Sequence, residues 1–239
     1  MQEFRDFCLQ LGSSRNIAGT PSVQKSLLVN LVDCVRKMWS PINFKGVISP
    51  QTLVKVLGQA SHGKFASGLS PDASGSTIDL LRFLLSYIHA AFLNPNLGIG
   101  GEAVQNSKST VISECFQGVV QVTETINNKS DNTKQTKVKS VPFNYLSLDI
   151  PPTPLFRESE GGRIVPNIPI HQLLEKFNGR KPAEQFTQAA HTSRRFRILK
   201  LPKYVILNCD RKETQNFSKR GRNCTVVAFP VSSLEFCSV

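Results

Sequence analysis

The stretch from Arg194 to Cys209 reads R-R-F-R-I-L-K-L-P-K-Y-V-I-L-N-C, and it decides the fold that we expect for this chain. Its first half alternates basic and apolar side chains from Arg195 to Ile198, which is the period of a half-buried strand. Residues 204 to 207 then run apolar without a break, as in a strand that is covered on both faces. A charged segment, Asp210 to Asn223, separates this stretch from a second apolar run, Cys224 to Pro230. We therefore predict a long hairpin at the centre of a sheet.

The length and composition indicate a folded globular protein. The 239 residues are 40% hydrophobic and 19% charged, which is enough for one large domain or two small ones and is not typical of a disordered chain. The first residues carry charges where a secretory signal has its apolar core. No apolar run reaches about 18 residues, so we expect no membrane-spanning segment.

The chain is strongly basic, with a formal net charge of +12 and a pI near 9.7. This charge favours an anionic neighbour such as RNA, DNA or an acidic protein surface. A basic surface that serves only for solubility has the same composition, so the charge alone leaves both interpretations open.

The cysteines are scattered and form no Cys-x-x-Cys pair. Scattered cysteines, several at core-like positions, indicate a reducing compartment. Structural zinc needs clustered thiolate or imidazole ligands at short spacing, so we expect no metal and no other cofactor. The cysteines are Cys8, Cys34, Cys115, Cys209, Cys224 and Cys237.

Helical periodicity dominates the first part of the chain. We predict a first helix that is capped by Thr20 with Pro21 at its first position, and that Ser40-Pro41 ends. A shorter helix begins at Ser49-Pro50 and ends at Gly58. The third helix, Thr77 to Leu93, carries few polar residues and is expected to be buried on most sides.

Strand patterns follow, which together with the helices predict an α+β architecture. We divide the chain into a helical region 1–93, a flexible linker 94–110 and a β region 111–239 with one or two short helices, all parts of a single incomplete domain. Within the last region we expect, in order, a strand 111–122 bent at Gly118, a lysine-rich mobile tip or solvated hairpin end 127–140, a strand 141–150, a helix 168–177 capped by Asn167 and closed by Gly179, and a C-terminal strand or helix beginning at Ser232.

Several motifs, in this order, resemble the ubiquitin-specific protease (peptidase C19) family, and the resemblance covers most of the chain. They are Ile78–Leu85, Cys115–Gly118, Pro142–Ile150, Ile168–Gly179, Leu201–Leu207 and Val226–Pro230. Met38–Lys45, Tyr145–Leu155 and Glu175–Gly179 are similar to the catalytically inactive branch of that family that is associated with the spliceosomal tri-snRNP. The resemblance implies a partial ubiquitin-specific-protease-like fold, with a helical thumb followed by an antiparallel fingers and palm sheet.

Departures from the family pattern indicate that this chain is not an enzyme. The family's cysteine box would precede Met1 and its histidine box would follow Val239, so neither is found in these residues. Cysteine proteases need a thiolate beside an imidazole. Thr123–Ile126 stands where many members have the first Cys-x-x-Cys of the fingers, and the second pair is missing near residues 187–193. We therefore assign no catalytic and no metal-binding residue.

The basic segment between Arg211 and Asn223, together with two arginines of the preceding strand, is the candidate binding site. The arginine and lysine side chains of this segment surround one phenylalanine and could contact phosphates or an acidic partner, although a basic loop of this kind is often only solvated. The candidate residues are Arg194, Arg195, Arg211, Lys212, Phe217, Lys219, Arg220 and Arg222.

The resemblance implies a non-catalytic, protein-binding role in pre-mRNA splicing, in the nucleus. The implied partners are tri-snRNP proteins, including helicase and scaffold components, with possible RNA contact, possible residual ubiquitin binding and no membrane. Two other interpretations stay open. In the first, the chain is part of an active ubiquitin thioesterase whose catalytic boxes lie outside it. In the second, it is a basic RNA-binding module.

Overall fold

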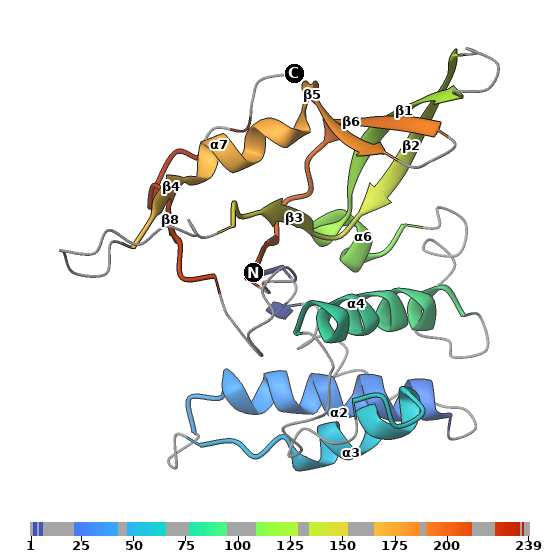
Figure 1. Cartoon of the computed structure of the whole chain (residues 1–239). Coiled ribbons are helices and arrows are strands. Elements are labelled where there is room, and N and C mark those ends of the chain that lie inside the picture. The colour runs from blue at the N-terminus through green and yellow to red at the C-terminus, as the bar shows by residue number, and fades with distance from the viewer. Residues whose placement is uncertain are drawn as a thin grey trace. The chain divides into compact units, whose positions relative to one another are not determined.

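The computed structural model describes residues 2–3, 5–6, 22–42, 47–65, 77–94, 109–128, 134–152, 165–186, 190–211, 223–234 and 236, of which 127–128, 184–186 and 190–191 are described by their backbone alone. The chain forms two compact units, Met1–Phe116 and Gln117–Val239 (Figure 1). The first unit is helical, and the second holds all the described strands. The predicted α+β class is confirmed. Most of the predicted linker lies outside the described residues, and the predicted division at 93 and 111 stays a prediction.

The first unit contains α2 (Val23–Met38), α3 (Gln51–Ala60) and α4 (Thr77–Leu93). The bounds of α4 are those that the sequence predicts. Helix α2 begins later than predicted, because the Ser22 side chain accepts the Lys25 amide at 3.2 Å and caps the helix. Helix α3 continues through Gly58 and ends before His62 and Gly63, whose φ values of 50° and 85° are left-handed and incompatible with a helix.

The core of the first unit lies where α2, α3 and α4 meet. Leu27 is fully buried there beside Val56 and Leu57. Aromatic rings extend this core, with the Phe83 centroid 5.5 Å from Phe65 and 5.2 Å from Tyr87. Helix α4 therefore has a buried side, although most of its residues stay partly accessible, so burial on most sides was too strong a prediction.

The prediction of a strand from Val111 is wrong, because residues Val111–Phe116 form the helix α6. The Thr110 amide donates to the Ser113 hydroxyl at 2.8 Å, and the Ser113 amide donates to Thr110 Oγ1 at 3.2 Å. This reciprocal cap starts the helix. The helix buries Ile112, Cys115 and Phe116, and these positions fit one helical face as well as they fit a short strand.

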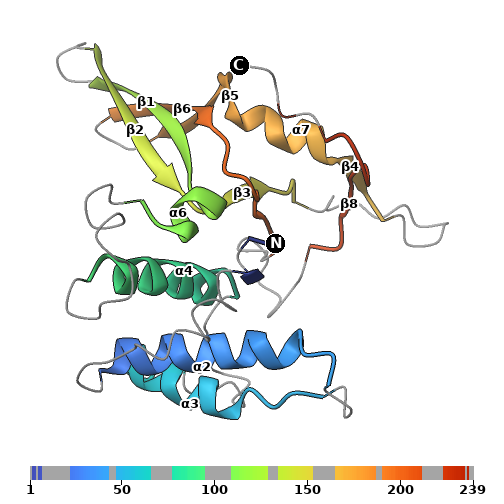
Figure 2. The same cartoon turned by 180° about the vertical axis from the view of Figure 1, so that it is seen from behind.

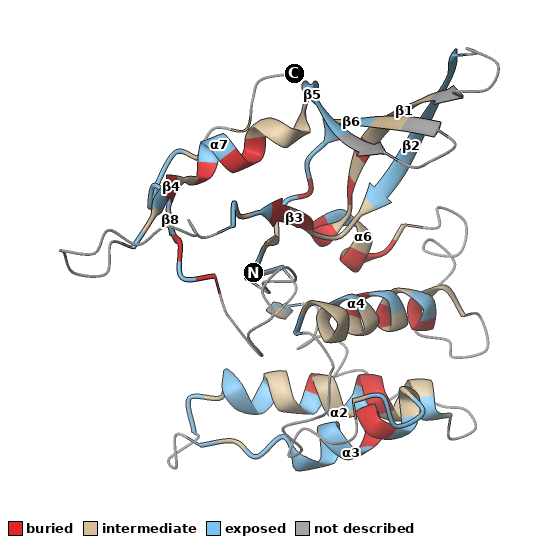
Figure 3. Ribbon diagram, viewed as in Figure 1, coloured by how far each residue is buried: buried red, intermediate tan, exposed pale blue. Residues whose placement is uncertain are grey.

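The second unit is built on a four-stranded antiparallel sheet in the order β2-β1-β6-β5 (Figures 1 and 2). The strands are β1 (Gly118–Asn128), β2 (Lys134–Phe143), β5 (Asn178–Phe186) and β6 (Ala190–Lys200). Strand β2 is an exposed edge (Figure 3). Of the two alternatives predicted for residues 127–140, the solvated hairpin end fits residues 134–140, because they are exposed and pair in unbroken register with β1. Residues 129–133 lie outside the described part.

Two short parallel pairs complete the second unit. Strand β3 (Leu146–Asp149) pairs with β7 (Leu207–Asp210), and β4 (Asn167–Pro169) pairs with β8 (Val226–Ala228). The predicted hairpin is therefore wrong: β7 and β8 each pair with an earlier strand and not with one another. Strand β7 also begins at Leu207, so Tyr204–Ile206 do not belong to it. Apolar character alone could not distinguish a hairpin from two parallel pairings, because both bury the same side chains.

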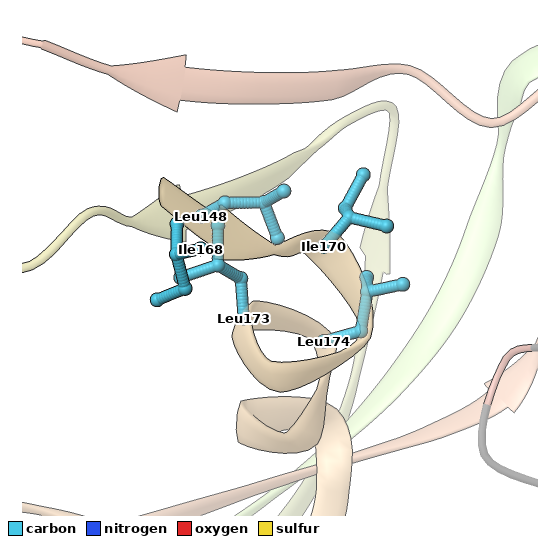
Figure 4. Close-up of a cluster of buried hydrophobic side chains, with 5 residues drawn as sticks. All are labelled: Leu148, Ile168, Ile170, Leu173 and Leu174. Atoms are coloured by element: carbon cyan, nitrogen blue, oxygen red, sulfur yellow. The ribbon is translucent and has the colours of Figure 1, made fainter. Parts of the chain in front are cut away.

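A second core cluster lies beside these parallel pairs (Figure 4). Helix α7 (Ile170–Leu174) and the 3-10 turn η2 (Glu175–Phe177) follow β4. The predicted helix therefore begins later than expected, because residues 167–169 form a strand. The cap of α7 is Pro169 and not Asn167. Gly179 follows with φ of 78°, as the predicted end of a helix requires. Among the described residues after Ser232 there is no helix or strand. The cluster consists of Leu148, Ile168, Ile170, Leu173 and Leu174, with Leu207, Cys209 and Val227 packed against it.

Candidate functional site

The register of the four-stranded sheet sorts its side chains onto two faces, since cross-strand partners share a face and successive residues alternate. One face, here called the apolar face, carries Val120, Val122, Val141, Phe196 and Ile198 and then, further along the strands, Glu124, Lys137, Lys139 and Arg194. The other, here called the polar face, carries Val119, Gln121, Thr123, Thr125, Thr136, Val138, Ser140, Pro142, Ser193, Arg195 and Arg197. From β5 the register places Asn178, Pro182, Glu184 and Phe186 on this face, the last two described by their backbone alone.

The apolar face is packed within the second unit. Val120 and Ile198 are buried. The Phe177 ring of η2 meets the Phe196 ring edge-on at a centroid distance of 6.3 Å. The Lys176 ammonium lies 5.7 Å from the centroid of each of these rings. This face therefore contributes to the core, and its apolar residues explain the alternation in the sequence.

On the polar face the two arginines and the β2 residues are exposed, and the β1 residues are half-buried. Arg195 stands in a cross-strand row with Val138, Thr123 and Pro182, and Arg197 stands in the next row with Gln121 and Asn178. No salt bridge joins either arginine to a carboxylate among the residues that the structure describes. Arg195 and Arg197 are therefore candidate binding residues for an external anion.

Arg194 differs from its neighbour Arg195 because its charge is used inside the sheet. Its Nε and Nη2 atoms both lie 2.8 Å from Glu124 Oε1. Lys137 faces the same Glu124 from the opposite strand, so the carboxylate lies between two cations in one cross-strand row. An exposed pair of this kind contributes little stability, but it reduces the charge that Arg194 offers to a partner.

Arg211 closes the base of the basic segment. Its Nη1 atom donates to the Asn223 carbonyl at 3.1 Å and to the Thr225 carbonyl at 2.7 Å. The Asn223 amide donates back to the Arg211 carbonyl, and the Asn223 side chain donates to the Pro151 carbonyl at 2.7 Å. Asn223 and Thr225 are buried. The guanidinium of Arg211 therefore joins the two ends of the segment, which is a structural role.

The other predicted residues of this segment lie outside the described part of the chain, and as binding residues they stay predictions. They are Lys212, Phe217, Lys219, Arg220 and Arg222. The structure adds Arg197, which shares the exposed face of Arg195. The alternation of arginine with Phe196 and Ile198 already carries this information, because a period of two places both arginines on one face.

Helix α7 and strand β5 line an open hollow of about 320 Å³ in the second unit. Its lysines already have acidic partners: Lys176 Nζ lies 2.6 Å from Asp149 Oδ2, and Lys181 pairs with Glu175. The hydrogen bond from Lys181 and then its charge lower the pKa of Glu175. The hollow is lined by Asp149, Pro151, Ile168, Gln172, Leu173, Lys176, Lys181, Pro182 and Ala183. It offers few unused charges to a ligand.

Of the described cysteines and histidines, Cys115 and His89 occupy structural positions, whereas Cys224 and His171 are exposed. Cys115 is buried in α6. His89 Nδ1 lies 2.7 Å from Thr110 Oγ1, and burial lowers the pKa of His89. Within the described residues no group of three or more His, Cys, Asp or Glu side chains is placed to hold a metal ion. No helix in the described ranges is long and apolar enough to cross a membrane.

Comparison with known proteins identifies the class. The sequence model of the ubiquitin carboxyl-terminal hydrolase family matches residues 1–238, so the chain belongs to this family. Solved structures agree on the fold. A structure described as an essential yeast splicing factor superposes with a TM-score of 0.57 at 23% identity, covering 99% of this chain and 51% of that one. The predicted ubiquitin-specific-protease-like fold is confirmed.

Similar proteins within this family include two whose names describe pre-mRNA splicing proteins. Human ubiquitin carboxyl-terminal hydrolase 39 is 29% identical over 97% of this chain. A probable mRNA-splicing protein of Schizosaccharomyces pombe, ubp10, is 29% identical over 87% of this chain, and the Saccharomyces cerevisiae pre-mRNA-splicing factor SAD1 is 27% identical over 90%. The matches cover only 40% to 42% of these relatives, so the chain spans about two fifths of their length.

Proposed function

We propose that this chain is a non-catalytic, ubiquitin-protease-like docking domain that acts in pre-mRNA splicing in the nucleus as part of the spliceosomal tri-snRNP. One observation carries the proposal. The chain is similar over 87% and 90% of its length to two proteins whose names describe splicing proteins. The similarity thus extends across both units, and it is not limited to a shared helix or strand motif.

The placement of Cys115 and of His89 supports a non-catalytic role for these two side chains. A cysteine protease needs an accessible thiolate with an imidazole beside it. Cys115 is buried within a helix, and His89 is bonded to a threonine hydroxyl that caps the next helix. The lowered pKa of His89 follows from burial and not from a neighbouring thiolate.

The proposed partners are protein components of the tri-snRNP, including its helicase and scaffold proteins, together with RNA and ubiquitin as further ligands to be tested. The two units offer them different surfaces. The first unit exposes Met38, Trp39 and Ile42 at the end of α2, and large exposed apolar side chains are typical of protein-binding surfaces. The second unit offers the polar face of the sheet, and its sequence is basic between Arg211 and Asn223.

Co-purification from nuclear extract tests the proposal. The whole chain carries an affinity tag, and the bound fraction is analysed for the RNAs of the tri-snRNP. We expect these RNAs to be recovered with the wild-type chain. Charge reversal at Lys212, Lys219, Arg220 and Arg222 tests the basic segment, and we expect weaker recovery. Arg211 is left unchanged in this variant, because its guanidinium joins the ends of the segment.

Incubation with a ubiquitin–fluorophore substrate tests the rival interpretation of an active thioesterase. The proposal predicts no turnover and no reaction with a cysteine-reactive ubiquitin probe. Turnover that disappears when one cysteine of this chain is replaced by serine contradicts the non-catalytic assignment. Ubiquitin binding without turnover is compatible with it, and is measured separately by titration of labelled ubiquitin.

A further inference from the structure

The basic residues of the sheet fall into two groups that differ in what their charges contact. Arg194 is bound to Glu124, while Arg195 and Arg197 have no carboxylate partner among the described residues. Charge on a protein surface that no internal partner neutralises attracts anions and steers their approach. The polar face is thus the part of the described sheet where two neighbouring arginines remain available to an external anion.

The geometry of this face is regular. Arg195 and Arg197 are two residues apart on one strand, which places their Cα atoms roughly 6.6 Å apart. Gln121 and Thr123 of β1 stand opposite them, and Asn178 stands beside Arg197 on β5. The face therefore presents a row of two guanidinium groups with hydroxyl and amide donors on both sides.

The neighbouring glycine restricts Arg197. Gly179 adopts φ of 78°, and a Cβ at this position would lie 3.3 Å from the Arg197 Cβ and 3.5 Å from its Cγ and Cδ. The aliphatic stem of Arg197 thus lies against the bare Cα of Gly179. A stem held in this way loses less conformational entropy when its guanidinium binds a ligand.

The composition of the face favours one class of partner. Val138 is a large exposed apolar side chain on it, Val119 and Pro142 lie at its end, and no aromatic ring lies there among the side chains that the structure describes, which do not include Phe186. Stable protein interfaces need an apolar, often aromatic centre. Contacts to nucleic-acid phosphate and sugar come instead from arginine, lysine, serine, threonine, asparagine and glutamine. These types dominate the polar face.

We propose that the polar face of the four-stranded sheet binds the sugar–phosphate backbone of RNA, with Arg195 and Arg197 as the phosphate contacts. Contacts to phosphate and sugar carry no direct sequence information, so this binding is expected to be independent of base sequence. The choice of RNA as the nucleic acid rests on the proposed function in splicing, whereas the choice of a phosphate backbone rests on the face itself.

The test compares two double variants that remove the same charge from opposite faces of the sheet. Arg195→Gln/Arg197→Gln removes the proposed contacts, and Lys137→Gln/Lys139→Gln is the control, because both lysines lie on the other face. Binding of the full chain to a short fluorescein-labelled single-stranded RNA is followed by anisotropy at several salt concentrations. Circular dichroism and thermal unfolding verify that both variants fold.

The expected result is a selective loss. A phosphate contact to single-stranded nucleic acid contributes about 0.7 to the slope of log affinity against log salt, so loss of two contacts weakens binding roughly 20-fold at about 0.1 M salt and lowers the slope by about 1.4. The lysine control should change affinity less than about threefold. Equal weakening by both variants, or no RNA binding by the wild type, overturns the proposal.

A competition arm separates RNA from an acidic protein. Unlabelled RNA should displace the labelled RNA, and a glutamate-rich peptide at the same charge concentration should not. Displacement by the peptide as efficient as by RNA overturns the proposal in favour of an acidic protein partner. Recovery of tri-snRNP RNAs from extract is measured on the same arginine variant in parallel. If purified RNA does not bind but the particles are still recovered, the RNA face is refuted while the docking function stands.

Discussion

The four-stranded sheet and the region of the two parallel pairs use charged residues in opposite ways. In the sheet, Arg195 and Arg197 are exposed and have no acidic partner among the described residues. In the parallel region, the Arg211 guanidinium binds two backbone carbonyls, and Lys176 binds Asp149. The same residue types therefore serve as surface charge in one region and as structural links in the other.

This difference follows from how each region obtains its backbone partners. The sheet satisfies its amides through long antiparallel ladders of neighbouring strands, so the charged side chains of its polar face are not needed as partners for backbone groups. The parallel pairs are only three or four residues long and join distant parts of the chain. Buried backbone groups beyond their ends need side-chain partners, and Arg211 and Asn223 supply them. Removing a charge should therefore affect stability in the parallel region and binding in the sheet.

The largest contrast is expected from truncating one apolar side chain in each region. Leu148 is fully buried in the core beside the parallel pairs, whereas Val138 on β2 is 58% exposed. Leu148→Ala should destabilise the chain by about 3 kcal/mol, because it removes buried methyl groups and leaves a cavity. Val138→Ala should stay within about 0.5 kcal/mol of wild type. Urea unfolding measures both, and a small effect of Leu148→Ala would contradict the assignment of this core.

Truncating an arginine in each region tests the comparison itself. Arg211→Ala leaves the carbonyls of Asn223 and Thr225 without a donor and should cost about 2 kcal/mol. Arg195→Ala should change stability by less than about 0.5 kcal/mol. The same denaturation assay applies. If the two variants unfold alike, the distinction between structural and surface arginines fails.

A smaller effect is expected at Gly179. Its φ of 78° disfavours any residue with a Cβ, and the new methyl group would press on the stem of Arg197. Gly179→Ala should destabilise the chain by about 1 kcal/mol. Thermal unfolding of this variant alone and together with Arg197→Ala separates the two causes. The contact with Arg197 predicts that truncating the arginine relieves part of the cost.

The exposed ion pair of the sheet should matter still less. Arg194 and Glu124 are joined at 2.8 Å but remain in contact with solvent. A double-mutant cycle with Arg194→Ala and Glu124→Ala should give a coupling of about 0.5 kcal/mol, decreasing with added salt. A coupling as large as the cost of Arg211→Ala would show that this part of the sheet is not merely a solvated surface.

A pH effect of modest size is expected from His89 in the first unit. Burial lowers its pKa below the ordinary value of 6.5. The unfolded chain therefore binds a proton on His89 more readily than the folded chain does. The contribution of His89 to the free energy of unfolding is complete above about pH 6.5 and is lost as the pH falls toward the folded-state pKa. NMR titration of the imidazole should give a midpoint below 6.5. A midpoint above this value would contradict the burial.

Local patterns predicted the parts of the fold whose determinants are local. The apolar spacing of α4 gave its bounds, and the alternation around Phe196 gave β6 and the face on which Arg195 and Arg197 lie. The pairings of β7 and β8 were not predictable in this way. Their partners, β3 and β4, are distant in the sequence, and an apolar run does not encode the direction of its neighbour.

The candidate site shows the same limit. The sequence pattern placed Arg194, Arg195 and Arg211 in one candidate site, because all three are basic and lie near an apolar run. Only the cross-strand register separates Arg194, which faces Glu124, from Arg195, which faces Thr123. Only tertiary structure reveals that Arg211 contacts carbonyls of residues 223 and 225. The helix α6 was missed for a different reason, since the reciprocal Thr110–Ser113 cap uses serine where glutamate or glutamine is usual.

The most direct test of the proposed docking function is the amount of tri-snRNP RNA that the tagged 239-residue chain recovers from nuclear extract, relative to a tag-only control. We expect clear enrichment with the wild-type chain and no enrichment with the destabilised Leu148→Ala variant at a temperature where that variant is unfolded. Recovery of the RNAs at the level of the tag alone, from a chain that circular dichroism shows to be folded, would contradict the proposed role in splicing.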